Sequence, residues 1–391
     1  MISFVEHIDM QPGARVALGM SGGVDSSVAA RLLMDAGFDV VGVTCVFVDD
    51  ENTCRAVEDA RMVAERLGVP HVVKDCTDRF ACAVVDPFVD EYAQGRTPSP
   101  CVACNRSCKI PSLVEAADGL GCRFVATGHY ARIVRRGDRL AVARSAFAAK
   151  DQSYMLSMLS QEQLARLVLP LGSIAEGKAR VRELAAQWGL PVASKSDSQD
   201  ICFIQGSHLD FLADRGLVGD PGSIVTADGR VVGRHKGLHR YTIGQRKGLD
   251  IGGAPEPYYV VDKRAHGNEL VVAFASGASI AGVLVSDLVW QGEHASRVLE
   301  TLASGGSYAC SVKLRYRQAA VACRVTVPDA AMEPLPGETI SKNAGFVSAL
   351  EVVLDEPQAT TAPGQYAVLY DGDAVVAAGV IEALRHEALP L

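Results

Sequence analysis

The 391-residue sequence contains no apolar run of about 18 residues, the length that a membrane-spanning helix requires. Its first residues also lack the basic start and apolar core of a secretory leader, so we expect none. Both absences favour a cytosolic protein, in which thiols stay reduced. The eleven cysteines are therefore expected to be packing residues plus a reactive or metal-binding minority, and not a disulfide framework.

An excess of positive charge is missing as well. The chain carries 46 Asp and Glu against 38 Lys and Arg, a net charge of −8, which argues against indiscriminate DNA binding. Two segments are nevertheless locally basic and contain no acid, residues 230–247 and 307–328. Each is either a solvated basic face or part of a surface that holds a nucleic acid.

Internal repeats and low-complexity segments are also absent, and the first half of the chain alternates between strand-like and helical patterns. The strand-like runs cover residues 14–20, 38–48, 71–75 and 122–131, and the helical patterns cover 24–34 and 54–68. Strands that are apolar on both faces and alternate with helices are typical of a parallel sheet covered by helices. We therefore predict a doubly wound α/β domain over residues 1–205.

The pattern changes after Phe203 to short strands separated by Asp-Gly and Gly turns. We predict a small β-rich domain over residues 206–280. From residue 281 to 391 the alternation of apolar and polar residues continues, with an Asp371-Gly372 hairpin signal. This tail is expected to form a small β-barrel, with a sandwich as the alternative.

The stretch "GMSGGVDSS", residues 19–27, lies where the first predicted strand meets the first predicted helix. Gly22 and Gly23 allow a tight turn close to a ligand, serines supply hydroxyls, and the N–H groups of the helix start attract anions. The Gly-Lys-Ser/Thr ending of kinase-type loops is missing, and so is Gly-x-Gly-x-x-Gly. Asp25 inside a phosphate loop would repel phosphate unless a divalent cation bridges the two.

The stretch "SPCVACNRSC" places Cys101, Cys104 and Cys108 close together. By spacing alone it is compatible with a zinc site, an iron–sulfur anchor, a redox pair or a sulfur carrier. A zinc site requires four ligands, but the chain has a single Cys-x-x-Cys and no paired His or Cys at finger spacing. Zinc is therefore disfavoured, and the other three alternatives stay open.

The loop "SGGVDSS" resembles that of the adenine-nucleotide α-hydrolases, or ATP pyrophosphatases. The motifs "EYAQGRTPSPCVACN", "ATGHYAR", "KDQSYML", "SKSDSQDICFI" and "HRYTIGQRKGL" follow in an order that is similar to the tRNA-specific 2-thiouridylases. This resemblance covers nearly the whole chain. It implies ATP-dependent 2-thiolation of the wobble uridine (U34) of tRNA, by adenylation of the C2 oxygen and transfer of sulfur from a cysteine persulfide.

The same resemblance implies roles for individual residues. Cys104 takes the nucleophile position and Cys202 the persulfide position, and a transient disulfide between them would follow turnover. The implied ATP-binding residues are Gly19, Met20, Ser21, Gly22, Gly23, Val24, Asp25, Ser26, Cys45 and Gly128, with Mg²⁺ near Asp25 and no dedicated metal site. The implied tRNA-binding residues are Ser99, Pro100, Cys101, His129, Lys150, Asp151, Gln152, Arg315, Tyr316 and Gln365.

An alternative mechanism uses a [4Fe–4S] cluster on Cys101, Cys104 and Cys202, with one iron open to sulfide. Cys108 receives no role and is expected to be nearly silent on mutation. The expected partners are tRNAs that read Lys, Glu and Gln codons and a sulfur-donating cysteine desulfurase or relay protein, and we expect a monomer. Two rivals remain: an ATP pyrophosphatase for a small metabolite, which would not need the cysteine pair, and a non-catalytic RNA-binding or iron–sulfur scaffold, which would not need the phosphate loop.

Overall fold

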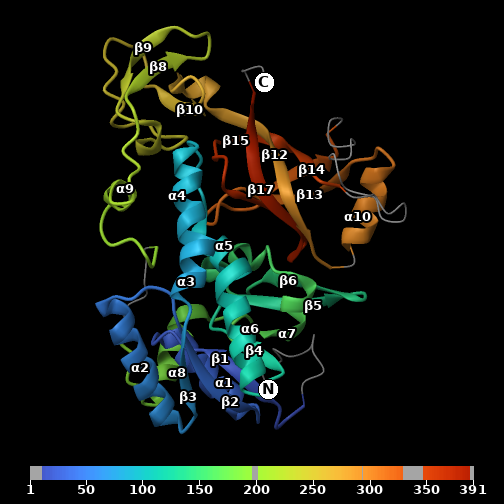
Figure 1. Cartoon of the computed structure of the whole chain (residues 1–391). Coiled ribbons are helices and arrows are strands. Elements are labelled where there is room, and N and C mark those ends of the chain that lie inside the picture. Colours follow the sequence, from blue (N-terminus) through green and yellow to red (C-terminus); the bar gives the residue numbers. More distant parts are fainter. Residues whose placement is uncertain (1–10, 196–200, 293, 329–346, 388–391) are drawn as a thin grey trace.

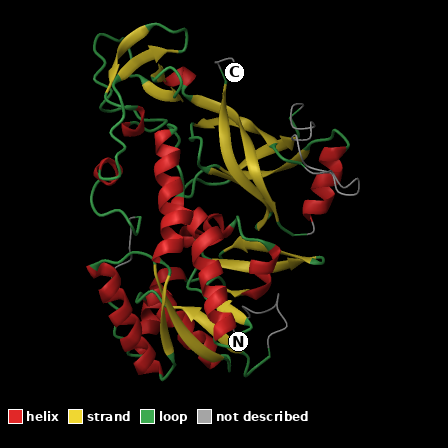
Figure 2. Ribbon diagram, in the orientation of Figure 1, coloured by secondary structure: helices red, strands yellow, loops and turns green. Residues whose placement is uncertain are grey.

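The computed structural model describes residues 11–195, 201–292, 294–328 and 347–387. Figure 1 shows an α/β body formed by the N-terminal part, a central group of strands beyond the far end of helix α4, and a β-barrel beside both. Figure 2 shows that most helices belong to the α/β body and most strands to the other two parts. No described helix is both long and apolar enough to cross a membrane.

The α/β body is built on a five-stranded sheet with the order β3-β2-β1-β4-β7, and all its strand pairs are parallel. The strands are β1 (Arg15–Gly19), β2 (Asp39–Val46), β3 (His71–Asp75), β4 (Phe124–Ala126) and β7 (Leu167–Val168). The flanking helices are α1 (Val24–Asp35), α2 (Glu51–Leu67), α6 (Ile110–Gly119) and α8 (Gly177–Gln187). The predicted parallel sheet with helices is confirmed.

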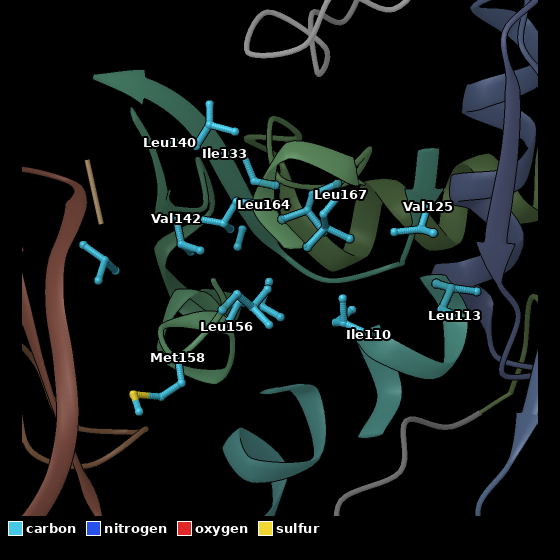
Figure 3. Packing of buried hydrophobic residues seen from close by; sticks show 14 of the residues in the cluster. Ile110, Leu113, Val125, Ile133, Leu140, Val142, Leu156, Met158, Leu164 and Leu167 are labelled. Carbon is cyan, nitrogen blue, oxygen red and sulfur yellow. The ribbon is translucent and has the colours of Figure 1, made fainter. Parts of the chain in front are cut away.

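The two faces of this sheet bury separate cores, because successive strand residues point in opposite directions. Val16 and Leu18 of β1 pack with α1, α2 and α8. Ala17 packs with α6 and with a core that extends through a hairpin into the barrel. Figure 3 shows this second core, in which Ile110 and Leu113 of α6 gather with side chains of β4, β7 and the hairpin. One continuous core therefore joins the α/β body to the C-terminal part.

A helical segment leaves β3 and returns to the sheet at β4. It contains α3 (Thr77–Phe80), a π-helical turn (Ala81–Val85), α4 (Asp86–Ala93), α5 (Pro100–Cys104), a second π-helical turn (Asn105–Lys109) and α6. Pro87 and Pro100 each stand in the first turn of a helix, where a missing N–H costs nothing. The three clustered cysteines therefore lie on one nearly continuous helical stretch.

The central part holds the short helix α9 (His208–Ala213) and a four-stranded sheet with the order β10-β11-β8-β9. Its strands are β8 (Gly222–Thr226), β9 (Val231–His235), β10 (Tyr259–Arg264) and β11 (Glu269–Ala273). Ile224, Val260, Leu270 and Val272 form its own core. The predicted central β-rich part is therefore present.

Six strands close into the C-terminal barrel, in the order β12-β15-β14-β13-β16-β17 with β12 paired to β17. They are β12 (Ser279–Trp290), β13 (Tyr308–Lys313), β14 (Val321–Thr326), β15 (Leu350–Ala359), β16 (Tyr366–Asp371) and β17 (Ala374–His386); helix α10 (His294–Ala303) follows β12. The barrel is confirmed over the sandwich. The hairpin β5 (Ala131–Arg136) and β6 (Arg139–Arg144) of the N-terminal part joins the barrel sheet at β17.

Polar contacts tie the barrel to the segment that carries the cysteines. Arg96 binds both Glu91 at 2.6 Å and Glu382 of β17 at 2.6 Å. The Thr97 N–H donates to the Pro363 carbonyl at 2.8 Å. Between Cys104 and Cys108, Arg106 forms an ion pair with Asp287 of β12. The cysteine segment is thus held against one side of the barrel.

Candidate functional site

The phosphate loop lies between β1 and α1, as predicted. Gly22 has φ +64°, and a Cβ at this position would lie 2.3 Å from the Ala56 carbonyl oxygen of α2, so only glycine fits. The Ser27 hydroxyl donates to the Gly23 carbonyl at 2.8 Å, and the Ser21 N–H donates to the Ser26 hydroxyl at 3.3 Å. No side chain caps the first turn of α1. Its amide N–H groups are therefore available to an anion such as a pyrophosphate.

Gly128 belongs to the same site although it is far away in sequence. A Cβ on Gly128 would lie 2.9 Å from the Asp25 carbonyl carbon and 2.9 Å from the Ser26 nitrogen. The end of β4 therefore touches the phosphate loop. The loop residues from Gly19 to Ser26 and Gly128, which the resemblance implies for ATP, lie together in the fold.

Two predicted ATP residues line the neighbouring strand β2. The buried Met20 side chain packs on Gly42, where a Cβ would lie 2.5 Å from its sulfur. Cys45 is half-buried near the end of β2, and its thiol donates to Cys76. The Cys45 side chain is thus engaged by another thiol, which leaves its backbone as the part suited to an adenine ring.

Asp25 is held by two side chains that the sequence analysis did not single out. Lys178 of α8 binds the two Asp25 carboxylate oxygens at 2.8 and 2.7 Å, and the Tyr130 hydroxyl donates to Oδ1 at 2.6 Å. Lys195 donates to the Gly22 carbonyl at 2.9 Å and pairs with Asp59. Two ammonium groups therefore face the loop. Lys195 stands in the quoted motif "SKSDSQDICFI", whereas no local signal marks Lys178.

Three cysteines lie on α5 and the helical turn after it, and Cys202 lies on a loop that packs near them. Cys104 and Cys108 are buried, in a cluster with Phe80, Phe88 and Phe203, whereas Cys101 and Cys202 are exposed. Cys202 directly precedes Phe203. Its thiol is close enough to Cys104 and Cys101 for their negative charges to raise its pKa. The two cysteines predicted as a remote pair thus lie at one place in the fold.

The surroundings of Cys104 favour its thiolate. Its pKa is lowered to about 7, first because the Cys108 thiol donates a hydrogen bond to its sulfur and further by the Lys109 ammonium, while burial opposes the shift. The pKa of Cys202 is raised to about 11 by desolvation and by the Cys104 charge. Near neutral pH the Cys104 thiol therefore ionises far more readily than the Cys202 thiol. The positive charge of Lys109 also favours the ionised forms of Cys101 and Cys202, although other causes raise the pKa of both thiols. The sequence did not point to Lys109 as a residue of this site.

The donor set for an iron–sulfur cluster was tested on the same thiols. Among residues 11–195, 201–292, 294–328 and 347–387, no group of three Cys, His, Asp or Glu side chains converges in a way that could hold a metal ion. Cys101, Cys104 and Cys202 all lie within these ranges. Their arrangement therefore does not fit a cluster held by three thiolates.

His129 and Tyr316 lie near the cysteine segment, His129 close to Lys109 and Tyr316 close to Cys101. His129 lies 2.7 Å from the Thr127 hydroxyl through Nδ1, and burial together with Lys109 lowers its pKa to about 3, so the ring is neutral. Tyr316, on the barrel, is half-buried. Burial raises the pKa of its hydroxyl, and the negative charge of Cys101 contributes to the same shift. A neutral imidazole near Lys109 and a phenol near Cys101 thus offer ring surfaces on which a base could stack.

Arg315 and Gln365 also lie on this side of the barrel. Arg315 is exposed, and its guanidinium donates to the Thr360 carbonyl. The Gln365 amide donates to the Thr97 carbonyl at 2.7 Å, two residues before Ser99. Ser99 is half-buried and Pro100 is buried. The barrel residues are therefore close to the cysteine segment, but Pro100 offers little free surface to a base.

The segment Lys150–Gln152 is only partly available to a ligand. Asp151 is buried, and its carboxylate accepts from the Ser145 and Ser153 N–H groups, both at 3.1 Å. The Gln152 Oε1 accepts from the Tyr130 N–H at 2.8 Å. The Asp151 side chain thus points inward and supports the loop, which was not foreseen from the sequence. Lys150 is half-buried.

Three family descriptions match the chain: "tRNA methyl transferase HUP domain" over residues 14–206, "tRNA methyl transferase PRC-barrel domain" over 209–274, and "Aminomethyltransferase beta-barrel domain" over 340–381. The chain is 40% identical over 374 residues to the tRNA-specific 2-thiouridylase MnmA of Trichlorobacter lovleyi, with 95% of this chain and 98% of that protein covered. It is 40% identical over 385 residues to MnmA of Carboxydothermus hydrogenoformans (94% and 97% covered) and 39% identical over 380 residues to MnmA of Bacillus pumilus (94% and 95% covered).

Proposed function

This chain belongs to the tRNA-specific 2-thiouridylase family, and on that premise we propose that it catalyses ATP-dependent 2-thiolation of the wobble uridine of tRNA. It is a tRNA-uridine 2-sulfurtransferase. One observation carries the mechanism: Cys202, far from Cys104 in sequence, lies near it beside Phe203, in a chain whose phosphate loop is intact. The division of the chain at residues 205 and 280 is part of the proposal.

The first step is the activation of the uracil C2 oxygen. ATP binds with its phosphates on the loop from Gly19 to Ser26, where amide N–H groups and the two lysines Lys178 and Lys195 balance negative charge. Mg²⁺ supplies further neutralisation of the phosphates when bound, and Asp25 is the carboxylate that would hold it. Attack of the C2 oxygen on the α-phosphorus releases pyrophosphate and leaves an adenylate at C2.

The second step delivers sulfur. A cysteine desulfurase or relay protein loads the exposed Cys202 as a persulfide. The Cys104 thiolate attacks the Cys202 Sγ, so that a Cys104–Cys202 disulfide forms and hydrosulfide leaves. Hydrosulfide adds to C2, and AMP departs with the original oxygen. The low pKa of Cys104 supports this assignment of nucleophile and carrier. Because Cys101, Cys104 and Cys202 do not converge as metal ligands among the described residues, we favour this relay over a [4Fe–4S] mechanism.

The tRNA is proposed to lie between the barrel and the cysteine segment. Arg315 meets a backbone phosphate, and Tyr316 and His129 flank the uridine, which must leave its stack to reach the adenylate. Ser99, Cys101, Lys150, Gln152 and Gln365 complete the binding surface. We propose that Asp151 and Pro100 act by holding this surface in place, because both side chains are buried. The enzyme is proposed to act as a cytoplasmic monomer on tRNAs for Lys, Glu and Gln.

The test is mass analysis of the wobble nucleoside after incubation with tRNA, ATP, Mg²⁺ and a persulfide donor. We expect 2-thiouridine to depend on ATP and to vanish in Cys104→Ala and Cys202→Ala, while both variants still release pyrophosphate in the presence of tRNA. Cys54→Ala, an exposed cysteine on α2, is the matched control and should keep full activity. Thiolation that persists without either Cys104 or Cys202 would refute the relay, and release of pyrophosphate without tRNA would indicate another substrate.

A further inference from the structure

Cys108 lies directly behind the catalytic thiol. It is four residues after Cys104 on the same helical stretch, so both side chains point to one side of it. Both belong to the cluster around Phe80 and Phe203, and Cys108 is fully buried. Its thiol donates a hydrogen bond to the Cys104 sulfur. Cys104 therefore has a second thiol in contact, in addition to its partner Cys202.

The contacts of Cys108 continue inward and not toward solvent. The Ser112 hydroxyl, which is also buried, bonds the Cys108 thiol and favours its ionised form. Ser112 in turn bonds Cys76 and accepts from Arg79 at 3.3 Å. While Cys104 is a thiolate, its hydrogen bond to Cys108 and the burial of Cys108 raise the pKa of the Cys108 thiol, and Ser112 opposes this shift only in part. Once Cys104 is bound in a disulfide, it no longer holds the Cys108 proton in this way, and no external thiol can reach the buried Cys108.

We propose that Cys108 is a second resolving thiol, which attacks Cys104 in the Cys104–Cys202 disulfide and replaces that bond by an internal Cys104–Cys108 disulfide. This rests on the proposed function. The Cys104–Cys202 bond breaks, the Cys104–Cys108 bond forms, and Cys202 leaves as a thiolate that takes up the proton lost by Cys108. The step is a thiol–disulfide exchange without net oxidation. A cytosolic monothiol or dithiol protein then reduces the internal disulfide by attack on the Cys104 sulfur, since Cys108 is fully buried.

Helix geometry permits this bond but makes it short-lived. Residues four apart on a helix have Cβ atoms about 5–6 Å apart, whereas a disulfide requires about 3.5–4.5 Å. The backbone must tighten by about 1–2 Å, and a strained disulfide is readily reduced. The consequence for turnover is that the exposed Cys202 becomes free for a new persulfide before any reductant has acted.

The experiment is a single turnover of the full-length enzyme without reductant, with tRNA, ATP, Mg²⁺ and one equivalent of cysteine persulfide. Free thiols are blocked with N-ethylmaleimide in acid, and peptides and nucleosides are analysed from the same sample. Trypsin cuts after Arg96, Arg106 and Lys109, so Cys108 lies on one peptide and Cys101 with Cys104 on another. Their disulfide is seen as a joined pair, and fragmentation of that pair tells Cys104 from Cys101. We expect this pair in a fraction of the wild-type enzyme, with Cys202 blocked in the same fraction, because the strain of the internal bond opposes the exchange.

Cys108→Val provides the comparison, because valine fills the buried site without a thiol. Its Cys104–Cys202 disulfide should accumulate, with Cys202 unavailable to the blocking reagent, while one turnover still yields 2-thiouridine. The wild-type result stands by itself if this variant fails to fold. Cys101, exposed and three residues before Cys104, is the competing resolving thiol, and a Cys101–Cys104 pair would overturn the proposal.

Cys310 and Cys323 report general oxidation. They lie directly opposite each other on β13 and β14, with their sulfur atoms 3.6 Å apart. An oxidant should join them regardless of tRNA, whereas the Cys104–Cys108 bond should require tRNA, ATP and persulfide. A Cys104–Cys108 bond without tRNA would overturn the proposal, and so would 2-thiouridine formation that leaves Cys108 fully blocked. Absence of 2-thiouridine in the wild type would instead refute the proposed function.

Discussion

A methyl group added at Gly128 tests the contact between β4 and the phosphate loop. In Gly128→Ala, the new Cβ would lie 2.9 Å from two backbone atoms, the Asp25 carbonyl carbon and the Ser26 nitrogen. Real Cβ atoms do not approach this closely, and neither backbone atom can rotate away. The φ of Gly128 is not positive, so alanine meets no conformational strain of its own. The whole effect therefore comes from displacement of the loop.

Overpacking of this kind costs about 1–3 kcal/mol of the free energy of unfolding, which lowers Tm by roughly 2–12 °C for a domain of this size. The effect on chemistry should be larger, because a misplacement of about 1 Å reduces rates on the order of 10²-fold. We expect pyrophosphate release to fall by about that factor, since Asp25 and the first turn of α1 move together. Binding of tRNA should fall much less, because Arg315, Tyr316 and Gln365 of the proposed surface lie on the barrel and only His129 adjoins the changed residue.

Gly119→Ala is the matched control. Gly119 is the exposed last residue of α6, and it also lacks a positive φ. No atom lies within 4 Å of the Cβ that alanine would add there. This variant should keep its activity and its Tm. Both enzymes are compared by pyrophosphate release at saturating tRNA and by thermal unfolding with and without ATP. Normal pyrophosphate release by Gly128→Ala would refute the view that β4 positions the loop.

Asp25→Ala should abolish pyrophosphate release, because it removes the carboxylate proposed for Mg²⁺ and the partner of Lys178. Filter binding of tRNA should stay nearly normal. Pyrophosphate release at the wild-type rate would contradict this role of Asp25. Labelling of Cys104 by iodoacetamide should rise with pH around a midpoint near about 7, since the thiolate is the reactive form. Cys108→Val removes the thiol that donates to this sulfur, so the midpoint should move to higher pH; an unchanged midpoint would show that Cys108 does not stabilise the thiolate. Arg315→Ala should weaken tRNA binding and reduce the salt slope by about one unit, and an unchanged slope would exclude a phosphate contact.

The sequence by itself determined the features whose geometry is local. The parallel sheet follows from short apolar runs alternating with helical patterns, because a strand buried on both faces has no polar side. The phosphate loop is nine contiguous residues, and a strand–glycine–helix junction has few conformations open to it. Alternating residues in the tail led in the same way to the barrel. The resemblance then added roles to residues that lie within these motifs.

Tertiary structure decided which distant residues meet. Spacing in the chain cannot show that Lys178 binds Asp25 or that Tyr316 lies beside Cys101, because such contacts depend on how separate elements pack. Burial was likewise invisible: Asp151 is as polar in the sequence as Lys150, yet its carboxylate is turned inward to satisfy N–H groups that would otherwise be unpaired.

The cysteine cluster shows both sides of this division. The motif "SPCVACNRSC" placed three thiols on one stretch but left their chemistry open, since identical spacings serve metals, disulfides and sulfur carriers. Packing buries Cys104 against Cys108, sets Lys109 nearby and brings Cys202 from a remote loop, which supports the proposed sulfur relay. The pKa of a thiol depends on the charges and hydrogen bonds around it in space, and those neighbours come from elements that only the folded chain brings together.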